Sequence, residues 1–140
     1  MANSDLKTFF IRGKGARPDG PRGGYAWFRT DKHKCGHEIL DDTTRNQAEY
    51  LAFLSVLRYV APKSRVLIFT DSKLVVDQFS GKSRVANPEL RKSARRARKL
   101  MEEKQLDVDV QRAPSWKPND AAQLLSERLQ FDRLGIWYGG

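Results

Sequence analysis

The 140-residue sequence lacks the features that mark exported or membrane-bound proteins. It has one cysteine, Cys35, so no disulfide can form within the chain, and a lone thiol is typical of a reducing compartment. No apolar run approaches the roughly 20 residues that cross a bilayer. The first residues, MANSDLK, do not show the basic-then-apolar pattern of a signal peptide. We therefore expect a cytoplasmic protein with no membrane partner.

Acidic residues are also scarce beside the basic ones. The chain has 17 Asp and Glu against 26 Lys and Arg, which leaves a formal net charge of +9. Such an excess on a small body favours a polyanionic partner, nucleic acid above all. The length predicts one domain, residues 1–140, and 39% hydrophobic residues are enough for one core.

Five segments have the composition of β-strands: residues 7–12, 24–30, 34–40, 65–70 and 107–112. The first three follow one another with only loops between them, which predicts an antiparallel meander. The segment RVLIFT is a continuous apolar run, typical of a central strand covered on both faces. The last segment, DVDVQR, alternates polar and apolar residues, as an edge strand does.

Helical spacing begins at Thr44, with Thr43 or Thr44 as the N-cap and with Leu51 and Leu54 as core candidates. A short helix is expected over KLVVDQF, which ends near Gly81. The resulting order is βββαβααβα, which predicts an α/β protein with one mixed sheet surrounded by helices.

Two further helices complete that order. The first begins at Asn87-Pro88-Glu89, a cap residue followed by proline and an acid in the first turn. The second is capped by Asn119. The residues expected to face the core are Leu90, Ala94, Ala97 and Met101 on the first helix, and Ala122, Leu125, Leu129 and Leu134 on the second.

Four motifs occur in an order that resembles the type 1 ribonuclease H family. They are FFIRGKGARPDGPRGGYAW, TTRNQAEYLA, FTDSKLVV and the weaker WKPNDAAQLLSE. Together they span about residues 7–126, most of the chain. The resemblance implies the ribonuclease H-like fold: a five-stranded mixed sheet, its first three strands antiparallel, with helices on both faces.

In that family four carboxylates hold two divalent metal ions that activate water for phosphodiester cleavage. The resemblance implies that Glu49 and Asp71 are two of these acids. The positions of the other two are occupied by Arg12 and Gln123. Arginine brings a permanent charge to the place of the metal, so we expect Arg12 to form a buried ion pair between Glu49 and Asp71. If the site were active, Asp120 would supply a third acid.

Basic residues gather in two regions. The segment GKSRVANPELRKSARRARK places Arg91, Arg95 and Arg98 on one side of the expected helix. The glycine-rich loop is the second region, and Trp116 beside Lys117 could stack on a base. The residues expected to bind nucleic acid are Lys14, Arg17, Arg22, Lys82, Arg84, Arg91, Lys92, Arg95, Arg96, Arg98, Lys99, Trp116 and Lys117.

Other notable side chains are given structural roles. Tyr25 and Trp27 lie on a strand and are expected in the core, whereas Trp137-Tyr138 either covers a core edge or is an exposed contact. His33, Cys35 and His37 are too few for a zinc site and are interpreted as ordinary residues.

These patterns favour a non-catalytic protein that binds RNA through its phosphates, with weak sequence preference and no cofactor. RNA–DNA hybrid and single-stranded DNA are the other expected partners, and multivalent assembly with RNA is a further expectation. One alternative is an active ribonuclease H that uses Mg²⁺ or Mn²⁺ on Glu49, Asp71 and Asp120. Another is a protein-interaction module.

Overall fold

The computed structural model describes residues 5–82, 84–114 and 118–135. Its sheet has five strands in the order β3-β2-β1-β4-β5. They are β1 (Leu6–Lys14), β2 (Gly23–Arg29), β3 (Lys34–Leu40), β4 (Arg65–Thr70) and β5 (Asp107–Arg112). β1, β2 and β3 pair antiparallel, whereas β4 is parallel to both β1 and β5. The predicted mixed sheet, with β5 at one edge, is confirmed.

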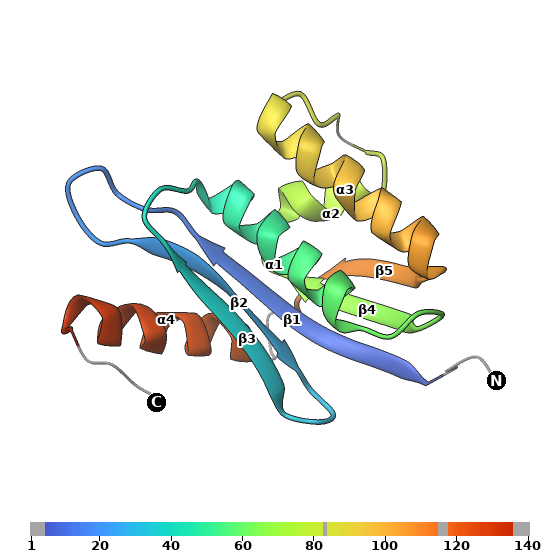
Figure 1. Cartoon of the computed structure of the whole chain (residues 1–140), viewed down its shortest axis with the longest axis horizontal. Helices are drawn as coiled ribbons and strands as arrows, with labels where there is room; N and C mark the ends of the chain where they lie inside the picture. The colour runs from blue at the N-terminus through green and yellow to red at the C-terminus, as the bar shows by residue number, and fades with distance from the viewer. Residues whose placement is uncertain (1–4, 83, 115–117, 136–140) are drawn as a thin grey trace.

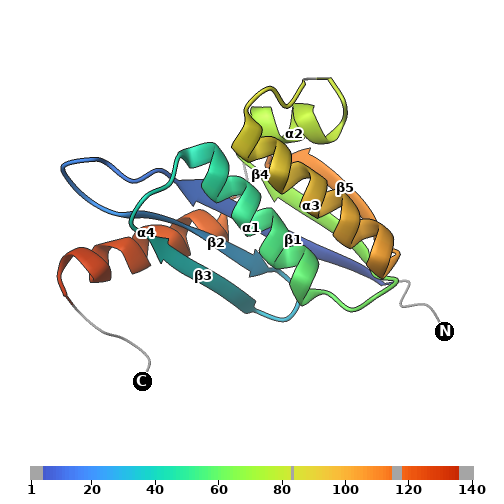
Figure 2. The ribbon, with the colours of Figure 1, turned by 45° about the horizontal axis from the view of Figure 1, so that its top comes forward.

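Helices cover both faces of this sheet. They are α1 (Arg45–Tyr59), α2 (Lys73–Phe79), α3 (Pro88–Lys104) and α4 (Asp120–Arg133). α1 and α3 lie side by side on one face, and α4 crosses the opposite face below β1 and β2 (Figures 1 and 2). Within the described ranges, no helix is long and apolar enough to cross a membrane.

The predicted helix starts are capped by side chains. Thr44 accepts a hydrogen bond from the Gln47 N–H, while the Gln47 side chain accepts one from the Thr44 N–H, a reciprocal capping box. Asn87 accepts from the first turn of α3 and is followed by Pro88 at the first helical position. The sequence signals for both helices are therefore satisfied by the hydrogen bonds they predict.

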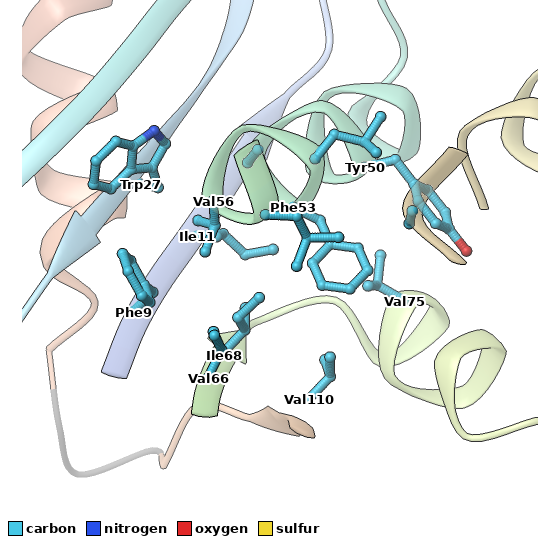
Figure 3. Packing of buried hydrophobic residues seen from close by; sticks show 14 of the residues in the cluster. Phe9, Ile11, Trp27, Tyr50, Phe53, Val56, Val66, Ile68, Val75 and Val110 are labelled. Atoms are coloured by element: carbon cyan, nitrogen blue, oxygen red, sulfur yellow. The ribbon is translucent and has the colours of Figure 1, made fainter. Parts of the chain in front are cut away.

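The main core lies between the sheet and the α1–α3 layer. Phe9 and Ile11 of β1, Phe53 of α1 and Ile68 of β4 are at most 2% exposed, and they pack around one centre (Figure 3). Trp27 is buried among them, as expected, and Tyr25 is half-buried against the same cluster.

A second, smaller cluster fills the space between the sheet and α4. Phe10 and Ala26 of the sheet pack there against Leu125 and Leu129, both predicted to face inward. Successive residues of β1 therefore serve different layers, because side chains alternate across a strand. Phe9 and Ile11 face α1, whereas Phe10 faces α4.

Three local predictions need correction. Leu134 is 62% exposed, because α4 ends at Arg133 and the following residue lies past its last packed turn. Leu51 is only half-buried, whereas Leu54 is fully buried. The strand predicted over residues 7–12 is longer than expected, because Gly13 still pairs with Tyr25 and β1 continues to Lys14.

The far end of α3 is tied to the end of α1 by one side chain. The Lys104 Nζ donates hydrogen bonds to the Leu57 carbonyl at 2.7 Å, to the Arg58 carbonyl at 3.1 Å and to the Val60 carbonyl. These are the carbonyls that a helix leaves unpaired at its C-terminus, where a positive charge is favourable. Burial lowers the pKa of Lys104.

Candidate functional site

Parallel pairing brings the ends of β1 and β4 together. Ile11 lies opposite Thr70, so Arg12 and Asp71 follow at the same edge of the sheet. The Arg12 Nη1 donates a hydrogen bond to the Asp71 Oδ2 at 3.0 Å. This ion pair joins the two strands, and it is one of the two contacts that the sequence predicted for Arg12 in place of a metal ion.

Asn119 also reaches this ion pair. Its Nδ2 donates to the Asp71 Oδ2 at 2.9 Å and to the Ile11 carbonyl at 3.2 Å. Its Oδ1 accepts from the Ala122 N–H at 3.0 Å and caps α4. The sequence indicated only the capping role, because nothing in a helix-start signal shows where the second half of the amide points.

Glu49 is fully buried beside the pair, and both of its carboxyl oxygens have donors. Oε1 accepts from the Gly13 N–H and Oε2 from the Thr70 hydroxyl, each at 2.9 Å. The contact needs glycine at position 13, since a Cβ there would lie 2.4 Å from the Glu49 nitrogen. Burial raises the pKa of Glu49, and the two hydrogen bonds and the charge of Arg12 partly offset that rise.

The expected bridge of Arg12 between two acids is wrong in two respects. Arg12 has no bond to Glu49, because it lies on the α4 side of β1 whereas Glu49 comes from α1 on the other face. The Arg12–Asp71 pair is also not buried, since the two side chains are 35% and 33% exposed. Glu49 is instead held by a backbone amide and a hydroxyl.

Gln123, which the resemblance places at the fourth acid position, lies elsewhere, and so does Asp120, the acid expected to act there if the site were active. Both line a shallow hollow that also contains Phe28 and His33. The hollow beside Arg12 takes Ala122 and Ser126 from α4 instead. The structure thus brings Arg12, Glu49 and Asp71 together, with Asn119 as the α4 residue that completes the group.

The residues present do not fit the pair of metal ions that the resemblance implies. Magnesium needs several oxygen ligands in near-octahedral geometry. Asp71 Oδ2 already accepts from Arg12 and Asn119, and both Glu49 oxygens are engaged. Among the described residues, no three or more His, Cys, Asp or Glu side chains form a group that could hold a metal ion.

The hollow beside Arg12 is strongly basic, with a volume of about 310 Å³. Its lining includes Lys14, Arg22, Arg45 and Arg133. Arg22 is engaged, because it donates to Asp132 of α4 and to Asp41 at 3.1 Å, and these bonds raise its pKa. This residue therefore ties the glycine-rich loop to α4. Arg17, also predicted to bind nucleic acid, is exposed.

The basic face of α3 forms a second hollow, of about 710 Å³. The side chains that line it are Arg84, Val85, Ala86, Arg91, Ala94, Arg95 and Arg98. Four of these seven are arginines and none is acidic. The helical spacing that placed Arg91, Arg95 and Arg98 on one side is confirmed.

The other basic residues of α3 are more loosely arranged. Lys92 lies 4.0 Å from Glu89, and Lys99 lies 3.9 Å from Glu103, on the surface of the same helix. Arg96 and Lys82 are exposed. The predicted contacts at Trp116 and Lys117, and the pair Trp137-Tyr138, lie outside the described residues. Cys35 is an exposed free thiol.

No family model and no curated protein matches the sequence. Solved structures do match the fold. The N-terminal ribonuclease H domain of Rv2228c from Mycobacterium tuberculosis, solved as a fusion with maltose binding protein, is 23% identical with a TM-score of 0.71, covering 92% of this chain and 98% of that one. Ribonuclease H1 of Halobacterium salinarum is 22% identical with a TM-score of 0.73, covering 91% and 99%.

A third match is LC11 ribonuclease H1 in complex with an RNA/DNA hybrid. It is 22% identical, has a TM-score of 0.76, and covers 91% of this chain and 99% of that one. The chain therefore has the ribonuclease H fold, as the order of its motifs predicted.

Proposed function

We propose that this protein binds nucleic acid, RNA in particular, mainly through phosphates, and that it does not cleave what it binds. The observation that carries the proposal is the hollow of α3, where Arg84, Arg91, Arg95 and Arg98 line one surface that includes no acidic residue. Like charges at i, i+4 spacing weaken a helix, so their accumulation costs stability. A polyanion that neutralises them offsets that cost.

The choice of RNA rests on analogy with the fold. One structural neighbour, LC11 ribonuclease H1, was solved with an RNA/DNA hybrid. The ribose 2′-hydroxyl is the group by which proteins distinguish RNA from DNA. An RNA-containing strand is therefore the first partner to test, with single-stranded DNA as the comparison.

The contacts at the ends of β1 and β4 support the absence of cleavage. Arg12 occupies the place of a metal-binding acid and donates to Asp71. The two carboxyl oxygens of Glu49 accept hydrogen bonds from Gly13 and Thr70. A fixed guanidinium opposes a second cation at the same carboxylate. The remaining acids then serve to hold the two strand ends together.

Salt dependence tests the binding proposal directly. We expect the affinity for a single-stranded RNA to fall linearly with salt on logarithmic axes, by roughly 0.7 per phosphate contact. Four arginine contacts give a slope of roughly −3, or about a fifty-fold loss between 0.05 and 0.2 M salt. Fluorescence anisotropy of a labelled strand measures this slope. Affinity that does not change with salt, or no binding at 0.05 M, contradicts the proposal.

A specific observation also supports a second candidate, an active ribonuclease H. Asp71 remains after β4, Glu49 of α1 contacts the neighbouring Thr70, and the fold neighbours are ribonuclease H domains. This function requires hydrolysis of RNA in a hybrid that depends on Mg²⁺ or Mn²⁺ and is lost in Asp71→Asn.

A further inference from the structure

The arginine-lined hollow of α3 opens into an apolar pocket. The two share three lining residues, Val85, Ala94 and Arg98, so they form one continuous groove. The inner pocket has a volume of about 310 Å³, within the range of about 300–1,000 Å³ typical of ligand sites. The groove therefore changes from cationic at its mouth to apolar at its floor.

Aromatic rings form much of this floor. Tyr50 and Phe53 come from α1 and Phe79 from α2, and all three line the pocket. Phe53 and Phe79 meet edge to face, with centroids 5.7 Å apart. Figure 3 shows Tyr50 and Phe53 turned toward the α2 side, close to Val75. Tyr50 and Phe53 are 3% and 2% exposed, whereas Phe79 is half-buried, so the ring available for stacking against a planar ligand is that of Phe79.

One polar group interrupts the apolar wall. The Tyr50 hydroxyl donates to the Gln78 Oε1 at 2.5 Å, and Gln78 is only 5% exposed. The Gln78 carbonyl oxygen is thereby used as an acceptor, which leaves its amide N–H groups as donors on this wall. A ligand that enters the pocket meets aromatic faces together with hydrogen-bond donors.

We propose that this groove binds one unstacked nucleotide of a single strand, with the base in the apolar pocket and the flanking phosphates on Arg91, Arg95 and Arg98. The inference rests on the proposed function and specifies its preferred substrate: a strand with free bases binds more tightly than a duplex, which the arginines contact through its phosphates alone. A nucleobase supplies both a planar face for the aromatic rings and carbonyl or ring-nitrogen acceptors for the Gln78 amide. Bases that are paired inside a duplex are stacked and cannot enter a pocket.

The charge of the mouth selects this occupant over a neutral one. Four arginines surround the entrance to a pocket that holds no acid of its own. A nucleotide carries its negative charges next to its planar part, in the same order as the cationic mouth and the aromatic floor of the groove.

The experiment compares a fluorescein-labelled ten-nucleotide oligouridylate with an abasic strand of the same phosphate count, by anisotropy at about 0.1 M salt. Stacking of one base is worth about 1–3 kcal/mol, which converts to a preference of at least about five-fold for the strand with bases. Ala94→Phe, which fills the shared wall, should remove this preference. The matched control is Ser93→Phe, a half-buried neighbour on α3 that does not line the groove, and it should keep the preference.

The outcomes separate this inference from the proposed function. Equal affinity for the two strands overturns the base pocket and leaves phosphate binding intact, whereas no binding of either strand overturns both. If an acidic peptide binds instead, and Ala94→Phe weakens the peptide but not the strands, the groove belongs to a protein partner and the inference is wrong.

A second measurement needs no variant, in case Ala94→Phe does not fold. The wild-type protein is irradiated with a 4-thiouridine strand and the adducts are located by mass spectrometry. Adducts on Tyr50, Phe53, Phe79 or Met101 support the base pocket. Adducts confined to exposed residues of α3 overturn it.

Discussion

Arginines have opposite surroundings in two regions of this molecule. At the ends of β1 and β4, Arg12 is bonded to Asp71, and the same carboxylate oxygen receives Asn119. In the groove of α3, Arg84, Arg91, Arg95 and Arg98 line a surface that includes no acid. The comparison teaches that positive charge alone does not identify a binding surface. What distinguishes the two regions is whether the charge is already neutralised within the fold.

The largest expected effect comes from reversing the unneutralised charges. Arg91→Glu/Arg95→Glu/Arg98→Glu should lower RNA affinity at least about a hundred-fold at 0.1 M salt. The slope of log affinity against log salt should shrink by roughly 2, since each lost phosphate contact removes about 0.7. Anisotropy titrations at several salt concentrations measure both quantities.

The matched control changes the net charge equally at the other end of the sheet. Lys32→Glu/Lys34→Glu replaces two exposed lysines at the β2–β3 turn, and it is compared with Arg95→Glu/Arg98→Glu, which changes the net charge by the same amount. If this variant loses as much affinity as the α3 variant, binding follows net charge and the distinction between the two regions is wrong.

A second change removes the ion pair at the ends of β1 and β4. Arg12→Asp removes the guanidinium and places a third carboxylate beside Glu49 and Asp71, which should create a site for Mn²⁺. Binding to the folded state alone stabilises by about 1.4 kcal/mol at ten times the dissociation constant. We expect the melting temperature of this variant, measured by circular dichroism, to rise by several degrees in millimolar Mn²⁺.

Arg12→Asn separates charge removal from ligand addition, and it should show little change in Mn²⁺. An equal rise in the wild-type protein contradicts the view that Arg12 stands in the place of the metal.

A third prediction concerns a cation on α3 that the fold does neutralise. Lys104 donates to three carbonyls at the end of α1, so Lys104→Met should lower the free energy of unfolding by about 1–3 kcal/mol. RNA affinity should not change, because Lys104 does not line the groove. Urea unfolding and anisotropy together test this, and a large loss of affinity with unchanged stability would reverse the assignment.

The smallest expected effect is the pH dependence that Glu49 contributes. Because burial raises its pKa in the folded state, the folded protein holds this proton more tightly than the unfolded chain does. The free energy of unfolding therefore falls as the pH rises from the ordinary carboxyl pKa through the raised one. Glu49→Gln lacks this term and can still accept from Gly13. In urea unfolding between about pH 4 and 8, the free energy of unfolding of Glu49→Gln should rise relative to that of the wild type as the pH rises. Parallel dependences of the two proteins on pH contradict the assignment.

The sequence predicted the sheet and the helix starts well because those signals are local. RVLIFT is a strand from the first residue to the last, and Thr44, Asn87 and Asn119 cap the helices predicted for them. The spacing of Arg91, Arg95 and Arg98 was enough to place them on one face, since three residues on one helix need no tertiary information.

The contacts around Arg12 and Asp71 could not be predicted from local sequence signals. Asn119 meets Asp71, and Thr70 meets Glu49, only because four elements converge at one edge of the sheet. Gln123 was placed by counting from a motif, and α4 turns it toward Phe28 instead. The aromatic floor beneath Arg98 was missed for a related reason: Tyr50, Phe53 and Phe79 look like ordinary core residues in the sequence, and the pocket depends on how three helices pack.

The central claim is that one end of this fold holds nucleic acid while the other no longer cuts it. Its most direct test is gel electrophoresis of a labelled RNA–DNA hybrid incubated with the protein in Mn²⁺, run once under native and once under denaturing conditions. The account predicts a retarded complex on the native gel and an intact RNA strand on the denaturing one. Shortened RNA with wild-type protein, restored to full length by Asp71→Asn, would contradict it.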